Sequence, residues 1–96
     1  MIYTPLITPA AAVDIVNAVQ YYEQQLEGLG SRFSTEMTDA VGRICTLPFS
    51  FSIRYRNVRG VKLKSFPYLL LFQINDKTAT VSILRVYSTY QKPLWK

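Results

Sequence analysis

Apolar and polar residues follow two different periods along this chain, one in each half. From Ala12 to Leu26, apolar side chains recur every three or four residues, the spacing of one face of an α-helix. The stripe consists of Ala12, Ile15, Val19, Tyr22 and Leu26, with Val16 beside it. Thr8 and Pro9 precede it, and this pair is typical of an N-cap followed by the first helical position. The pattern predicts a helix of about four turns that begins after Thr8.

A second helical stripe follows the sequence Gly28-Leu29-Gly30, whose glycines can end the first helix in the left-handed conformation. Ser31 is expected to cap the new helix, and Leu47-Pro48 to end it. The stripe consists of Phe33, Met37, Val41 and Ile44, with Ala40 alongside. Because the connection is short, the two helices are expected to form an antiparallel hairpin with both stripes facing one core.

The period changes to two in the C-terminal half, which is the spacing of β-strands. Apolar residues alternate with lysines around residue 62, and residues 68–74 are apolar on both faces, as in a central strand. Residues 80–87 form a third β-rich stretch. Turns are expected at Ser65-Phe66-Pro67 and Asn75-Asp76-Lys77. Gly60 is expected to mark a bulge.

The segment Ile2–Ile7 also has strand character, but it contains Pro5. Proline cannot donate to a strand ladder, so this strand is expected at a sheet edge. The order of elements is therefore β-α-α-β-β-β. It predicts one α+β domain over residues 1–96, with an N-terminal strand, an antiparallel helix hairpin, and a three-stranded antiparallel meander that carries the helices on one face.

Charge divides between the two halves in the same way as the periodicity. Residues 1–49 hold two arginines and five carboxylates, a net charge of −3, and residues 50–96 hold nine lysines and arginines and one carboxylate, a net charge of +8. The helices are thus acidic and the strands basic. A cationic sheet surface suits phosphates or an acidic partner protein.

Several functional classes are disfavoured by composition. The chain has no histidine and one cysteine, Cys45, so nucleophile–histidine pairs, a disulfide within the chain and a metal site lack the necessary residues. Cys45 is interpreted as a small core residue. No Gly-rich phosphate loop, apolar membrane span or signal peptide is apparent. We expect a cytoplasmic protein that needs no cofactor and no metal, and that has no membrane partner.

The candidate chemistry is a set of basic residues with tyrosines among them. The cations are Arg54, Arg56, Arg59, Lys62, Lys64, Arg85, Lys92 and Lys96, and the tyrosines are Tyr55, Tyr68, Tyr87 and Tyr90. Such a surface could bind phosphates and stack on bases. The alternative is a solvated sheet face whose lysines deter aggregation and whose tyrosines pack within strands. Trp95 could either seal the edge of the core or anchor an interface.

Taken together, several short motifs resemble RelE/ParE-type toxins of bacterial type II toxin–antitoxin modules. They extend through nearly the whole chain in the expected order: Tyr21-Tyr22-Glu23, Gly28-Leu29-Gly30-Ser31-Arg32-Phe33 with Glu36, Pro48, Ile53-Arg54-Tyr55, Val58-Arg59, Lys64-Ser65-Phe66-Pro67-Tyr68, Pro93 and Trp95. The resemblance implies the same β-α-α-β-β-β architecture. It also implies a small toxin held inactive by an acidic antitoxin, whose tail would cover the cationic surface.

The superfamily has two branches with different targets. RelE-like members cleave messenger RNA on the ribosome, and they usually carry arginine after the middle-strand aromatic residue and basic residues after the last strand. This chain has Leu69 after Tyr68 and reads Tyr87-Ser88-Thr89-Tyr90 at the second place. The resemblance therefore favours the ParE-like, plasmid-stabilisation branch, whose members are associated with inhibition of DNA gyrase.

Three functional hypotheses follow. The first is a ParE-like growth inhibitor that binds a target such as gyrase, with its binding surface at Arg54, Arg56, Arg59, Lys62, Lys64, Tyr90, Lys92 and Trp95. The second is a ribosome-dependent messenger RNA endoribonuclease, in which Lys62, Lys64 and Arg85 hold phosphate and Tyr87 acts as the base. The third is a non-toxic binding module with the same fold.

Overall fold

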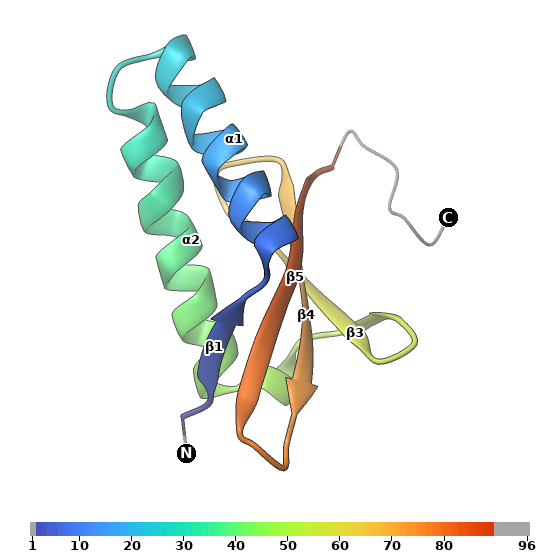
Figure 1. Ribbon diagram of the computed structural model, residues 1–96. Coiled ribbons are helices and arrows are strands. Elements are labelled where there is room, and N and C mark those ends of the chain that lie inside the picture. The colour runs from blue at the N-terminus through green and yellow to red at the C-terminus, as the bar shows by residue number, and fades with distance from the viewer. Residues whose placement is uncertain (1, 90–96) are drawn as a thin grey trace.

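The computed structural model describes residues 2–89 and consists of a helix hairpin packed on one face of a five-stranded sheet (Figure 1). The helical elements are α1 (Pro9–Gln25), α2 (Leu29–Thr46) and the short 3₁₀ helix η1 (Pro48–Ser50). The strands are β1 (Thr4–Ile7), β2 (Ile53–Tyr55), β3 (Val58–Lys62), β4 (Tyr68–Asn75) and β5 (Thr80–Ser88). The predicted α+β architecture is confirmed. No helix among residues 2–89 is long and apolar enough to span a bilayer.

The sheet has the order β1-β5-β4-β3-β2. Strands β3, β4 and β5 form the predicted antiparallel meander, and β1 joins its edge by pairing in parallel with β5. Pro5 thus lies in an edge strand, as expected. Strand β2 was not predicted. Its three residues are all exposed, so they carry no alternation of buried and exposed positions that a pattern could detect.

The core lies between the helix hairpin and the sheet. Its largest fully buried side chains are Phe33, Phe72, Ile44, Leu70, Ile83 and Val81. Cys45 is buried, as the sequence predicted. An aromatic cluster closes one end of the core, where the ring of Phe66 lies 4.7 Å from that of Tyr22 and 5.1 Å from that of Phe33. These contacts tie both helices to the loop between β3 and β4.

The predicted apolar face of α1 was partly wrong. Ala12 and Leu26 are exposed, and Val16 is 53% exposed, whereas Ala11 and Ala18 are buried. The face that packs on the core is therefore shifted around the helix from the predicted stripe. Ile15, Val19 and Tyr22 of the predicted stripe do pack against the core, together with Ala11 and Ala18.

The junction between the helices also differs from the prediction. Helix α1 ends at Gln25, and α2 begins at Leu29 after Gly28, which has a left-handed φ of 88°. Ser31 therefore lies inside α2 and is not its cap. The carboxylate of Glu23 on α1 performs that function, because it accepts hydrogen bonds from the backbone N–H groups of Gly28 and Gly30 at 3.0 Å.

Gly60 does not mark a bulge in β3, contrary to the prediction. Its Cα pairs in register with Leu71 on β4. The register shifts lie instead in β2, between Ile53 and Tyr55, and in the β4–β5 pair. A Cβ at Gly60 would lie 3.0 Å from Cγ of Arg54. Because glycine has no side chain, the side chain of Arg54 can lie across β3 at this position.

Candidate binding surface

The strand register sorts the predicted basic residues between the two faces of the sheet. Residues paired directly across neighbouring strands project on the same face. Val61, Leu70 and Val86 form one such row, and all three belong to the core or pack against it. The next row, Lys62, Leu69 and Tyr87, must therefore project from the opposite face, which the helices do not cover.

We call this side of β3, β4 and β5, which faces away from the helices, the open face. A second row on it consists of Gly60, Leu71 and Arg85. Arg54 reaches the same face, because its side chain lies over Gly60. The fold thus gathers Arg54, Lys62, Arg85 and Tyr87 around Leu69 and Leu71.

The remaining predicted cations lie elsewhere. Arg59 projects toward the helix side, where its Nη1 donates to the carbonyl oxygen of Phe51 at 2.7 Å and its guanidinium lies 5.3 Å from the Phe49 ring. These two contacts link Arg59 on β3 to η1 and to the residue that follows it. Arg56 lies at the β2–β3 turn with a positive φ of 53° and stacks on Tyr55. Tyr90, Lys92 and Trp95 lie outside the described residues.

Arg85 is held by an ion pair with Asp14 of α1. Its Nε and Nη2 donate to the two carboxylate oxygens at 2.8 and 3.1 Å. Asp14 also accepts the backbone N–H of Val86 at 2.9 Å, so its carboxylate occupies the edge of β5 where β1 has ended. The hydrogen bond to Asp14 raises the pKa of Arg85. The guanidinium lies 4.9 Å from the centre of the Tyr87 ring.

Tyr87 is buried on the open face. Only 7% of the residue is exposed, and its hydroxyl oxygen has no hydrogen-bond partner within residues 2–89. A general base must reach the proton that it removes. In this arrangement Arg85 is committed to Asp14 and the Tyr87 hydroxyl is covered, whereas Arg54 and Lys62 are exposed.

Most carboxylates of the chain accept hydrogen bonds from other groups of the protein. Besides Asp14 and Glu23, Glu36 accepts the backbone N–H of Ser65 at 2.7 Å, and Asp76 accepts the hydroxyl of Tyr3. That last bond raises the pKa of Tyr3. Within residues 2–89, Asp14–Arg85 is the single salt bridge. The other cations are thus left to attract an external anion.

Metal binding finds no support in the described part of the chain. No group of three or more Cys, Asp or Glu side chains is close enough there to hold an ion.

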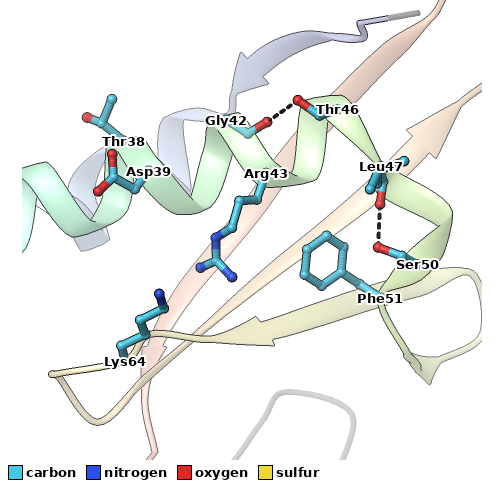
Figure 2. A pocket seen from close by; sticks show the side chains of 9 residues that line it. All are labelled: Thr38, Asp39, Gly42, Arg43, Thr46, Leu47, Ser50, Phe51 and Lys64. Carbon is cyan, nitrogen blue, oxygen red and sulfur yellow. Dashed lines mark hydrogen bonds between the residues drawn. The ribbon is translucent and has the colours of Figure 1, made fainter.

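One functional candidate escaped the sequence analysis. Arg43 lies in the last turn of α2, within the acidic half, and its side chain points toward Lys64 from the sheet half of the chain (Figure 2). Arg43 belongs to residues 1–49, the half with a net negative charge, so counting charge by half did not place it on a cationic surface. No sequence signal marked Arg43, because its approach to Lys64 and the exposure of Leu47 beside it follow from the fold.

Comparison with known proteins places this geometry in context. The family model described as "ParE toxin of type II toxin-antitoxin system, parDE" matches residues 6–93. A search of curated protein sequences gave no significant match.

Solved structures share the fold at low sequence identity. The chromosomal ParDE toxin–antitoxin system from P. aeruginosa matches with a TM-score of 0.78 and 15% identity, over 91% of this chain and 96% of that one. The isolated E. coli RelE toxin matches with a TM-score of 0.69 and 17% identity, over 97% and 90%. The RelBE2 toxin–antitoxin complex from Mycobacterium tuberculosis matches with a TM-score of 0.64 and 23% identity, over 92% and 99%.

Proposed function

This chain belongs to the ParE toxin family of type II toxin–antitoxin systems, and we propose that it arrests growth by binding DNA gyrase through its open face. An acidic antitoxin neutralises it. The observation that supports this most strongly is that Arg54 and Lys62 are exposed beside the partly exposed Leu69 and form no ion pair within residues 2–89. Cations beside an accessible apolar residue are typical of a protein-binding surface.

A purified-enzyme assay tests the target. Stoichiometric excess of the chain over gyrase is expected to block supercoiling of relaxed plasmid DNA. The double variant Arg54→Glu, Lys62→Glu should require about tenfold more protein for the same inhibition, because it reverses the charge of the rim. The matched control is Arg32→Glu, Lys77→Glu, which changes the net charge equally and lies off the open face. Normal supercoiling with the unmodified chain would refute gyrase as the target.

The endoribonuclease hypothesis has one observation in its favour. Lys62, Arg85 and Tyr87 lie on the same face, where a messenger RNA strand could reach Lys62. Cleavage of messenger RNA on purified ribosomes by the unmodified chain, lost in Lys62→Ala, would support this hypothesis. Cleavage that survives the combined change of Lys62, Lys64 and Arg85 to alanine would remove these residues from the active site.

A further inference from the structure

A groove separate from the open face runs between the C-terminal half of α2, the helix η1 and the segment after β3 (Figure 2). Its volume is about 840 Å³. The lining residues are Thr38, Asp39, Gly42, Arg43, Thr46, Leu47, Ser50, Phe51 and Lys64. Eight of these nine residues belong to residues 38–51, and Lys64 comes from the segment after β3, so the fold has to bring Lys64 to the groove.

Two cations converge in this groove. Figure 2 shows the guanidinium of Arg43 and the ammonium of Lys64 pointing into the same space from opposite walls. Both residues are exposed, and neither forms a salt bridge within residues 2–89. Two like charges that face each other are repulsive, and a carboxylate placed between them would relieve that repulsion. Asp39 lines the groove as well, but it makes no salt bridge with either cation.

The end of the groove at η1 is apolar. Leu47 lines this end and is 64% exposed, and the ring of Phe51 lies on the groove wall. A large apolar side chain that is exposed beside a groove is typical of a protein interface.

This end is also held rigidly before any partner arrives. The Ser50 hydroxyl donates to the Leu47 carbonyl oxygen at 2.7 Å, and Arg59 donates to that of Phe51 at the same distance. The Phe49 ring lies edge-on to Tyr3 at 6.4 Å. A preformed surface loses little conformational entropy on binding.

We propose that this groove docks an acidic amphipathic segment of a protein partner. A carboxylate of that segment lies between Arg43 and Lys64, and its apolar side chains pack on Leu47 and Phe51. Resting on the proposed function, this assigns the groove to the antitoxin and leaves the open face to the target. A nucleic acid fits less well, because Leu47 and Phe51 make one end of the groove apolar and only two cations line it.

The probe for the test is a fluorescein-labelled synthetic helical peptide of about 16 residues, with leucines on one face and glutamates along its border. Its binding to the full chain is followed by fluorescence anisotropy. The variant Arg43→Glu, Lys64→Glu is expected to weaken binding about tenfold or more. Arg32→Glu, Lys77→Glu, with the same change in net charge, should bind within about twofold of the unmodified chain. Thermal melts verify that both variants are folded.

A charge-swapped peptide keeps the test decisive. The same peptide with lysine in place of glutamate should bind the Arg43→Glu, Lys64→Glu variant more tightly than it binds the unmodified chain. The proposal is overturned if the glutamate peptide does not bind, if both double variants lose binding equally, or if a single-stranded RNA displaces the peptide completely. Because gyrase inhibition is measured separately, a failed peptide test leaves the proposed target standing, and the reverse also holds.

Discussion

At the scale of single residues, carboxylates of the acidic helices serve as internal connectors. Asp14 joins α1 to the edge of β5, Glu23 caps α2, and Glu36 holds the loop after β3. Each accepts at least one backbone N–H group that no strand or helix satisfies. A buried or half-buried donor without a partner is costly, so these contacts contribute to stability beyond their charge.

Removing the charge of Asp14 tests this role. Asp14→Asn is expected to lower the free energy of unfolding by about 1–3 kcal/mol, because the amide cannot replace all three hydrogen bonds to Arg85 and Val86. Urea denaturation measures the change. Asp39→Asn is the control, since Asp39 is exposed and forms no salt bridge within residues 2–89, and it should stay within about 0.5 kcal/mol. Equal effects of the two variants would contradict the assigned role.

Alkaline pH should destabilise the fold through buried neutral groups. Burial raises the pKa of the Cys45 thiol and of the Tyr68 hydroxyl, since it disfavours thiolate and phenolate. The folded state thus retains these protons more tightly than the unfolded chain. The resulting stability is present at neutral pH and is lost as the pH rises through the raised pKa values, beyond about 9–10.

Urea denaturation at pH 7 and at about pH 10 measures this loss, because the unfolded chain ionises these groups near their ordinary pKa values. Cys45→Ala is the informative control. It should show a smaller fall in stability between the two pH values than the unmodified chain. An identical fall would show that Cys45 does not contribute.

At the scale of elements, the helix hairpin depends on a close approach at one glycine. A Cβ on Gly30 would lie 2.8 Å from the backbone oxygen of Val19 and 3.1 Å from Cβ of Glu23. No such contact surrounds Gly42, which is also inside α2 but has nothing within 4 Å of its Cβ position. A side chain would therefore clash at Gly30 but would fit at Gly42, although both glycines lie in α2.

Alanine substitution at each glycine tests the difference. Gly30→Ala is expected to lower the free energy of unfolding by about 1–3 kcal/mol, because the helices must move apart. Gly42→Ala should raise it by about 0.5–1 kcal/mol through the higher helix propensity of alanine. Thermal melts followed by circular dichroism measure both. Stabilisation by Gly30→Ala would show that the hairpin can relax freely.

At the scale of the whole molecule, two separate surfaces carry positive charge that forms no salt bridge within residues 2–89. The open face presents Arg54 and Lys62, and the groove presents Arg43 and Lys64. They lie on different sides of β3, so a target and a neutralising partner need not compete for the same residues. This arrangement allows one small domain to engage two macromolecules.

The order of cellular events tests the proposed target. When the chain is induced alone in bacteria, pulse-labelling should show that DNA synthesis falls before protein synthesis, since blocked gyrase stalls replication. Arg54→Glu, Lys62→Glu should delay the fall, and Arg32→Glu, Lys77→Glu should not. An earlier collapse of protein synthesis would instead support the ribosome-dependent nuclease.

The sequence alone determined the elements that depend on local periodicity and caps. Thr8 does cap α1, by accepting the N–H of Ala11 at 3.2 Å, and the meander of the last three long strands was predictable from its alternation and turns. These features are encoded within a few residues of one another. Even so, β2 and part of the buried face of α1 were not predicted, because β2 is fully exposed and burial on α1 depends on the elements that pack against it.

Only the tertiary structure decided which charges are free and where they meet. Arg85 and Lys62 look alike in sequence, yet one is bound by Asp14 from another element and the other is exposed. Arg43 and Lys64 belong to halves of opposite net charge, and the packing of α2 against the sheet brings them to one groove. Electrostatic interactions act through space, so their outcome follows from three-dimensional proximity and not from order along the chain.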